Sequence, residues 1–158
     1  VDHGALCVRI PTVNVYFEKA EIECSSISCG QYHSVVVAAN GDCYTFGHNA
    51  YGNLGNGTIG EWGDAGCEEP HKLQMDAKVK QCASGYEHNV LLTQDNGVVV
   101  FGDNSHQQCS RICKEKLINS PMKLSKHEEF GIDEECYVSA ICCSQNQSLI
   151  IYDRFERV

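Results

Sequence analysis

The chain has 158 residues, with 12 basic and 21 acidic side chains that give a formal net charge of −9. This acidic balance provides no overall attraction for the phosphates of nucleic acid, so DNA or nucleosome binding by this segment is not expected. No apolar run approaches the ~18 residues of a membrane helix and no signal peptide opens the sequence, so no membrane contact is expected.

Short apolar or β-branched runs recur along the chain and predict β-strands. They cover residues 34–39, 43–46, 89–93, 98–101 and 148–152. Asn40-Gly41 and Asn96-Gly97 separate the members of the first two pairs, and such residues favour the tight turns of hairpins because they tolerate a positive φ. No segment has a sustained helical period with caps, although one helical turn is expected at 17–22 and another at 114–118. The pattern predicts an all-β fold.

Two stretches of the chain repeat one another. An offset of 55 residues relates Gly30 to Gly85, His33 to His88, Gly47 to Gly102 and Asn49 to Asn104. The further residues of the repeat are two turn glycines and a Gly-x-Leu-Gly motif: Gly41, Gly97, Gly52, Leu54 and Gly55. Self-similarity at such a period is typical of propellers and solenoids, in which each unit buries its faces against its neighbours.

The pattern continues weakly beyond these two copies. Residues 144–151 form a degenerate third copy with Gln147 at the histidine position, and residues 4–7 match the Gly-x-Leu-Gly motif. The matches predict four segments, which are the end of one unit with a linking strand at 1–26, a clear repeat at 27–81, a second repeat with a degenerate loop and an acidic insertion at 82–137, and the start of a third at 138–158. The chain therefore holds roughly three units.

Between Gly30 and Gly55 the chain reads Gly-x-x-His-Ser, an apolar stretch, Asn-Gly, Tyr-x-Phe-Gly-x-Asn and Gly-x-Leu-Gly. This run resembles the repeat of the regulator of chromosome condensation family. The resemblance covers nearly the whole chain and is strongest over 27–104. It implies a seven-bladed β-propeller of four-stranded antiparallel blades, built from repeats of about 50–55 residues. Because about four to eight blades close a propeller, we expect a partial propeller whose partners include the remaining blades.

Two insertions depart from the repeat and are candidates for binding, because loops on a rigid scaffold commonly carry function. The first, residues 58–69, contains the only tryptophan, Trp62, between Glu61 and Asp64. An exposed tryptophan can anchor a protein interface. The second, residues 126–135, is acidic around two apolar residues, and its candidate partner-binding residues are Glu128, Glu129 and Phe130. The alternatives are that Trp62 folds back onto its own loop and that the acidic run is solvated.

No catalytic site and no cofactor are expected in this segment. The repeated histidines, His33 and His88, indicate a structural role in which a ring nitrogen bonds the backbone of a blade. No nucleophile–base pair or carboxylate pair can be placed together, and no Gly-rich phosphate loop precedes a helix.

The eleven cysteines contain no Cys-x-x-Cys pair. His106, Cys109 and Cys113 are the one local cluster of metal-ligand types, but they overlie a degenerate loop of the repeat, and no metal is expected. Buried thiols behave as small hydrophobes and suit a reducing cytosol, which favours a cytoplasmic location with the nucleus as a second one. A disulfide-linked secreted module is the alternative.

Function has to be argued from binding and from the resemblance, because a fold alone does not define a function. Similar propellers occur in giant ubiquitin ligases of the HECT-containing and Highwire types, where another domain performs the ubiquitin chemistry. The resemblance implies a non-catalytic protein–protein interaction segment of a larger cytosolic regulatory protein, a scaffold or a module that binds substrates or regulators. The alternative is guanine-nucleotide exchange on a Ran-type small GTPase, with residues 58–69 as the wedge. A light-sensing member would need clustered tryptophans.

Overall fold

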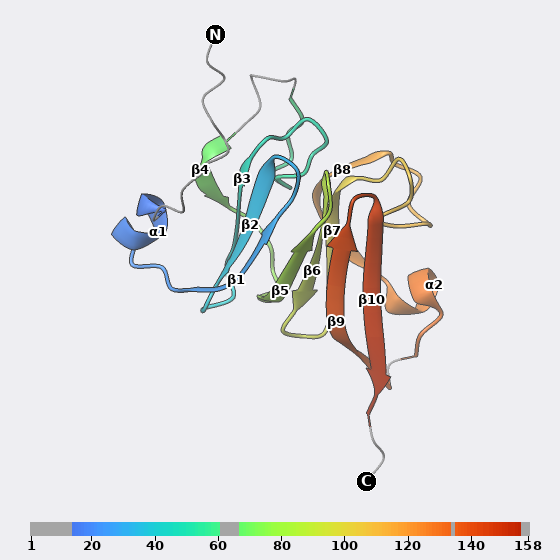
Figure 1. Ribbon diagram of the computed structural model, residues 1–158. Helices are drawn as coiled ribbons and strands as arrows, with labels where there is room; N and C mark the ends of the chain where they lie inside the picture. Colours follow the sequence, from blue (N-terminus) through green and yellow to red (C-terminus); the bar gives the residue numbers. More distant parts are fainter. Residues whose placement is uncertain (1–13, 61–66, 134, 156–158) are drawn as a thin grey trace.

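A computed structural model describes residues 14–60, 67–133 and 135–155 (Figure 1). Within these ranges the elements follow in chain order as α1 (Val15–Lys19), β1 (Cys24–Cys29), β2 (His33–Ala38), β3 (Cys43–Gly47), β4 (Cys67–Lys72), β5 (Val79–Ser84), β6 (His88–Thr93), β7 (Val98–Asp103), β8 (Leu117–Leu124), α2 (Lys126–Phe130), β9 (Cys136–Ser144) and β10 (Gln147–Arg154). Strands dominate, and the prediction of an all-β fold is confirmed.

The first two sheets are copies of one another. Strands β1–β4 and β5–β8 each form a four-stranded antiparallel sheet in chain order, and β9 and β10 form a two-stranded antiparallel sheet. His33 of β2 pairs with Gly47 of β3, and His88 of β6 pairs with Gly102 of β7. In both sheets the pairing of the third and fourth strands shifts register next to that glycine. We call the three sheets the first, second and third blades.

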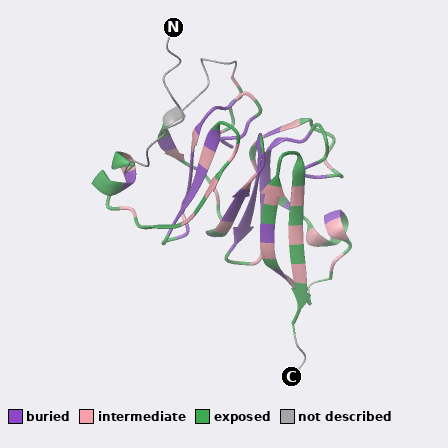
Figure 2. Ribbon diagram, in the orientation of Figure 1, coloured by how far each residue is buried: buried purple, intermediate pink, exposed green. Residues whose placement is uncertain are grey.

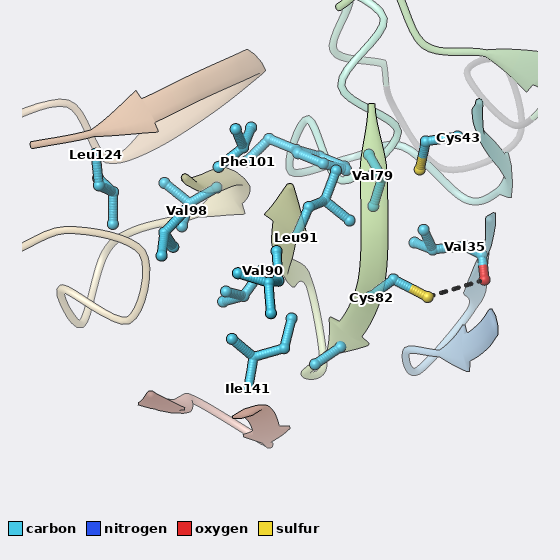
Figure 3. Packing of buried hydrophobic residues seen from close by; sticks show 14 of the residues in the cluster. Val35, Cys43, Val79, Cys82, Val90, Leu91, Val98, Phe101, Leu124 and Ile141 are labelled. Atoms are coloured by element: carbon cyan, nitrogen blue, oxygen red, sulfur yellow. Dashed lines mark hydrogen bonds between the residues drawn. The ribbon is translucent and has the colours of Figure 1, made fainter. Parts of the chain in front are cut away.

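One apolar core extends through all three blades (Figure 3). It includes Val35 of the first blade, Cys82, Leu91 and Phe101 of the second, and Ile141 of the third. The thiol of Cys82 also donates to the carbonyl oxygen of Val35 across the first junction, at 3.7 Å. Because successive side chains of a strand point to opposite faces, a blade with a neighbour on each side buries both faces. Strands β6 and β7 are accordingly buried at every position (Figure 2).

Equivalent residues differ sharply in exposure from one blade to another. Ile27, Cys82 and Ile141 occupy the same place on the first strand of each blade. Cys82 and Ile141 are 6% and 5% exposed against the preceding blade, whereas Ile27 is 68% exposed. At the other end, Leu149 and Ile151 of β10 are 60% and 47% exposed. Within the described part of the chain, the outer face of the first blade is therefore open at Ile27, although Phe17 of α1 covers Val36 and Tyr44 on that face. The outer face of the third blade is open along β10.

Each short helix packs a phenylalanine against the blade that follows it. Asn14 caps α1 by accepting from the backbone N–H of Tyr16, and the ring of Phe17 meets that of Tyr44 edge-on at 5.5 Å between centroids. The ring of Phe130 in α2 lies 5.6 Å from that of Tyr152. No described helix has the length and apolar character needed to cross a membrane.

The two helical turns expected from the sequence need correction. The one at 17–22 forms earlier, as Val15–Lys19, because Asn14 supplies the cap. The one at 114–118 is wrong, since Leu117 and Ile118 begin β8 and pair with the backbone of β7. The segment that does form a second helix lies in the acidic insertion, where Ser125 caps α2 by accepting from the N–H of Glu128.

Candidate functional site

The turns between first and second strands and the loops after third strands lie at one edge of the blades (Figure 1). We call this edge the loop face, and it comprises residues 30–32, 48–60, 85–87, 104–116 and 145–146. The turns of neighbouring blades are joined by backbone hydrogen bonds, from Gln31 N–H to Tyr86 O at 3.0 Å and from Tyr86 N–H to Gln145 O at 2.9 Å. The loop face is thus a continuous surface across the three blades.

A buried hydrogen-bond latch joins the first and second blades beneath the loop face. The Oδ1 atom of Asn89 lies 2.9 Å from Nε2 of His33, and Asn89 Nδ2 donates to the carbonyl oxygen of Asn53 at 2.9 Å. Since a carbonyl oxygen only accepts, His33 carries its proton on Nε2 and donates it. All three residues are buried. The latch therefore ties the start of β2 and the loop after β3 to the next blade.

The second and third blades are joined in the same way. Nε2 of His88 lies 3.0 Å from the hydroxyl of Ser148, which in turn donates to the carbonyl oxygen of Gln108 at 2.6 Å. Ser148 stands where Asn89 stands in the first latch, directly after the histidine or glutamine position of its own blade. Gln108 likewise stands where Asn53 does. The latch is therefore a repeated device of the junctions between blades.

Burial keeps both latch histidines neutral. It lowers the pKa of His33 from 6.5 to about 4, and it lowers the pKa of His88 equally far, to about 4. The Nδ1 atom of each ring is buried without a hydrogen-bond partner among the described residues. The expectation that a ring nitrogen bonds blade backbone is wrong for His33, whose partner is the Asn89 side chain of the next blade.

Glycine is required beside each latch ring. A Cβ on Gly30 would lie 2.0 Å from the Cε1 atom of His33, and one on Gly85 would lie 2.1 Å from that of His88. Real carbon atoms never approach so closely, so any side chain would displace the imidazole. The repeat of Gly-x-x-His in the sequence is therefore a packing requirement of the latch.

Two asparagines shape the long loops of the loop face. The Oδ1 atom of Asn49 accepts from the N–H of Leu54 at 2.9 Å, and its Nδ2 donates to the carbonyl oxygen of Thr58 at 3.1 Å. Asn104 plays the same part in the second blade, where its Oδ1 accepts from the N–H of Cys109 at 3.1 Å. Both loops thereby bury the side chain at the leucine position, Leu54 or Cys109.

Cys109 and His106, two of the three metal-ligand types suggested from the sequence, make other contacts. The Cys109 thiol donates to the carbonyl oxygens of Phe101 and Asp103, and burial raises the pKa of this thiol above its ordinary value. The ring of His106 lies on the exposed side of the loop. Among the described residues, no three histidine, cysteine or acidic side chains are grouped to hold a metal ion.

Three tyrosines are the large exposed aromatic side chains of the loop face. Tyr32, Tyr51 and Tyr86 are 40%, 40% and 43% exposed. The hydroxyl of Tyr86 accepts from the side chain of Gln145 in the next turn, at 3.3 Å. Their backbone belongs to turns that the latches and Asn49 hold in place. Sequence reasoning missed these tyrosines, although Tyr32 and Tyr86 both lie within the Gly-x-x-His turns.

The residues proposed from the sequence for partner binding fall in different places. Glu61, Trp62 and Asp64 lie outside the described residues. The insertion that contains them rejoins the sheet at β4, whose first residue pairs with Gly47 at the end of β3. The ends of this insertion are therefore attached to the loop face.

The second group lies on α2 and is divided between surface and interior. Glu128 is exposed and Phe130 is half-buried against the core. Glu129 is 6% exposed, and its carboxylate accepts from the hydroxyl of Ser110 at 2.8 Å and from the N–H of Arg111 at 2.6 Å. The carboxylate of Glu129 is thus engaged within the chain, where it holds the loop after β7.

Nine cysteines in the described ranges are free thiols, and four of these, Cys43, Cys82, Cys109 and Cys136, are buried. The four buried thiols serve as small apolar residues of the blades.

Two repeated four-stranded blades and a hairpin, joined by latches at equivalent positions, define a β-propeller built from sequence repeats. Two models of the regulator of chromosome condensation (RCC1) repeat match the chain, one over residues 40–92 and the other over 24–53 and 79–108, together more than half of it. The chain belongs to this family. The resemblance read from the sequence is therefore confirmed.

The chain is similar to parts of much longer proteins. It is 36% identical over 92 residues to the E3 ubiquitin-protein ligase MYCBP2 of Danio rerio, covering 58% of this chain and 2% of that protein. It is 31% identical over 143 residues to the regulator of chromosome condensation of Xenopus laevis, covering 81% of this chain and 33% of that protein. The chain thus spans a third or less of these relatives.

Solved structures show the same fold. The crystal structure of Prp20p from Saccharomyces cerevisiae, described with its binding properties to Gsp1p and histones, superposes with a TM-score of 0.73. The match covers 85% of this chain and 32% of Prp20p, at 18% sequence identity. At this identity the likeness establishes the propeller architecture.

Proposed function

We propose that the chain is a non-catalytic protein-interaction segment of a larger propeller and that the loop face contacts the partner. The observation that carries this proposal is the set of three exposed tyrosines, Tyr32, Tyr51 and Tyr86, on turns fixed by buried latches. Tyrosine offers a large apolar area, a polar tip and few rotatable bonds, and it is enriched among the residues that dominate binding energy. A rigid turn reduces the entropy lost when such a side chain is ordered on binding.

The insertion at 58–69 extends the proposed surface. Because its ends attach to the loop face, Trp62 with Glu61 and Asp64 would contact a partner together with the tyrosines. Glu128 of α2 adds an exposed charge, but Glu129 and Phe130 contribute by holding α2 and its neighbouring loop in place.

The remaining blades of the same propeller are proposed to cover the two open ends. The high exposure of Ile27 and Leu149, compared with their buried equivalents in the second blade, supports this proposal. Propellers close with about four to eight blades, and the described part of the chain supplies two full blades and a hairpin.

A role in ubiquitin signalling is supported by the similarity to part of MYCBP2, which is described as an E3 ubiquitin-protein ligase. In this proposal the segment acts as a scaffold or binds substrates or regulators, while another domain of the parent protein performs the ligase reaction. The location would be cytoplasmic, with the nucleus as a second site, which agrees with the free thiols of the described residues.

The test is capture of partners by the intact parent protein, read by proximity labelling and mass spectrometry. Two variants are compared with the wild-type protein. One carries both Tyr32→Ser and Tyr86→Ser, and the other carries Trp62→Ala alone. Val15→Ser on α1 is the matched control, because Val15 is also exposed, at 57%, but lies outside the loop face. We expect the tyrosine variant to lose ~10-fold or more of partner capture, as for residues at an interface centre, with unchanged unfolding. Equal capture by all variants would place the binding surface elsewhere.

Nucleotide exchange on a Ran-type GTPase is the second candidate. The observation that favours it is the similarity to the Xenopus regulator over 81% of the chain. The measurement is release of a labelled guanine nucleotide from such a GTPase in the presence of the parent protein. Faster release that depends on Tyr32 and Tyr86 would make exchange the leading function, whereas no acceleration at saturating protein would leave the scaffold role.

A further inference from the structure

The second blade carries two carboxylates where the first carries two rings. Tyr32 and His48 flank the pair His33–Gly47, and their rings meet edge-on at 6.2 Å between centroids. Glu87 and Asp103 flank the equivalent pair in the second blade. Like charges at directly opposed positions of antiparallel strands are destabilising. The second blade therefore contains a repulsion between two carboxylates that the first blade lacks.

The two carboxylates are poorly solvated. Glu87 and Asp103 are each 9% exposed, and the Oε2 atom of Glu87 is buried without a hydrogen-bond partner. In the described ranges, the ion pairs formed by lysines involve Asp42 and Asp95 instead. A buried carboxylate that lacks a cation favours its protonated form.

Besides burial, the charge of Asp103 raises the pKa of Glu87. The adjacent ring of His88 on β6 is neutral because of its burial. The turn of the first blade packed beside it contributes Gln31, and the turn of the third blade contributes Gln145, neither of which titrates. The proton is assigned to Glu87, because its Oε2 atom is buried without a hydrogen-bond partner.

Hydrogen bonds connect this pair to the second latch. The carboxylate of Asp103 accepts from the N–H of Ser105 at 2.9 Å and from the side chain of Gln108 at 2.8 Å. The carbonyl oxygen of the same Gln108 accepts from Ser148 of the third blade, which bonds His88. The first junction differs, since Asn53 there donates to the backbone oxygen of His48 and no carboxylate takes part.

We propose that Glu87 and Asp103 form a proton-dependent switch that controls the loop at 104–110 and, through Gln108, the contact between the second and third blades. With Glu87 protonated, the loop stays closed on Ser148. Loss of the proton leaves two opposed negative charges, and the loop opens to solvate them. The first junction, built on Tyr32 and His48, does not respond.

The pKa of Glu87 sets the direction of the effect. Burial, followed by the charge of Asp103, raises this pKa from 4.5 to about 7. A carboxyl whose native pKa is raised stabilises the closed state fully below pH 4.5, and this stabilisation is lost as the pH rises to about 7. The lowered pKa values of His33 and His88 act in the opposite direction over an overlapping range, so only a comparison with a Glu87 variant isolates the switch.

The experiment measures hydrogen exchange of the backbone amides of residues 104–112 in the intact protein between pH 5 and pH 8.5, corrected for intrinsic exchange rates. The equivalent loop at 49–57 of the first blade is the internal control. We expect the opening equilibrium of 104–112 to rise ~10-fold from pH 5 to 7.5, less than the full pKa shift allows because the site is close to solvent. Glu87→Gln should abolish the rise, and 49–57 should behave alike in both proteins.

A second measurement keeps the proposal testable if the variant folds poorly. Carbon-13 NMR of the Glu87 carboxyl in the wild-type protein should give a titration midpoint near pH 7. A midpoint at or below pH 5 would overturn the proposal, as would an unchanged pH dependence of 104–112 in Glu87→Gln. An equal rise in both loops would also overturn it, because the effect would then not depend on the carboxylate pair.

Discussion

Replacing Asn89 by alanine should break the first latch. The side chain of Asn89 is fully buried, donates to Asn53 O, and accepts from His33 Nε2 and from the hydroxyl of Ser84. In Asn89→Ala the N–H of His33 and the carbonyl of Asn53 are left buried without partners. Each orphaned group costs about 1–3 kcal/mol, so we expect a loss of ~3 kcal/mol in the free energy of unfolding. That loss is a roughly 100-fold change in the unfolding equilibrium.

Urea unfolding of the intact protein measures this change, and Asn89→Ser is the matched control. Serine performs the same task as Ser148 at the second junction, where one hydroxyl accepts and donates. We therefore expect Asn89→Ser to lose less than half as much stability as Asn89→Ala. A double-mutant cycle with His33→Ala should give a coupling of about 1–2 kcal/mol. Strict additivity of the two variants, or equal losses for serine and alanine, would show that the latch does not join the blades.

Three further predictions concern other parts of the blades. Gly47→Val should destabilise by a few kcal/mol or prevent folding, since Gly47 has a φ of 107° and a Cβ would lie 2.5 Å from Tyr32 O; thermal unfolding and expression yield would show it. In Glu87→Gln, which removes the opposing contribution of Glu87, stability should fall as the pH drops from 6.5 to about 4, because the unfolded chain then protonates His33 and His88 while the native state resists; denaturant midpoints over this range test the sign. Glu129→Ala should cost ~2 kcal/mol and increase hydrogen exchange at 110–112, which peptide-level exchange would detect.

The sequence predicted the fold because the repeat combines several independent requirements. Asn-Gly dipeptides mark the hairpin turns, short apolar and β-branched runs mark the strands, and Gly47 and Gly102 stand where a side chain would collide with the neighbouring strand. These requirements act within about 20 residues of chain and so leave a local pattern. The helix α2 was not predicted, because a five-residue helix has too few turns to show a period.

The partners of the latch histidines could not be derived from one unit alone. They lie 56 to 60 positions away, in the neighbouring blade. A signal nevertheless exists in the sequence, since small polar residues, Ser34, Asn89 and Ser148, follow the histidine or glutamine position in all three copies. The exposure of Tyr32 and Tyr86 was hidden for a different reason. Whether a tyrosine in a strand-connecting turn points outward depends on the packing of adjacent turns, which the pattern of one repeat does not record.

The two junctions therefore differ in what their loops can do, although their latches share one geometry. The first junction closes over Tyr32 and His48, whose interaction changes little above the lowered pKa of His48. It therefore holds Tyr32, Tyr51 and the ends of the insertion that contains Trp62 in place at every pH above that value. The second junction closes over the carboxylates of Glu87 and Asp103, and Tyr86 directly precedes the group that titrates. A partner that contacts Tyr32 and Tyr51 should bind with little pH dependence, whereas one whose contact extends to Tyr86 and residues 104–112 should bind more weakly above pH 7. Measuring affinity at pH 6 and pH 8 would distinguish the two footprints on the loop face.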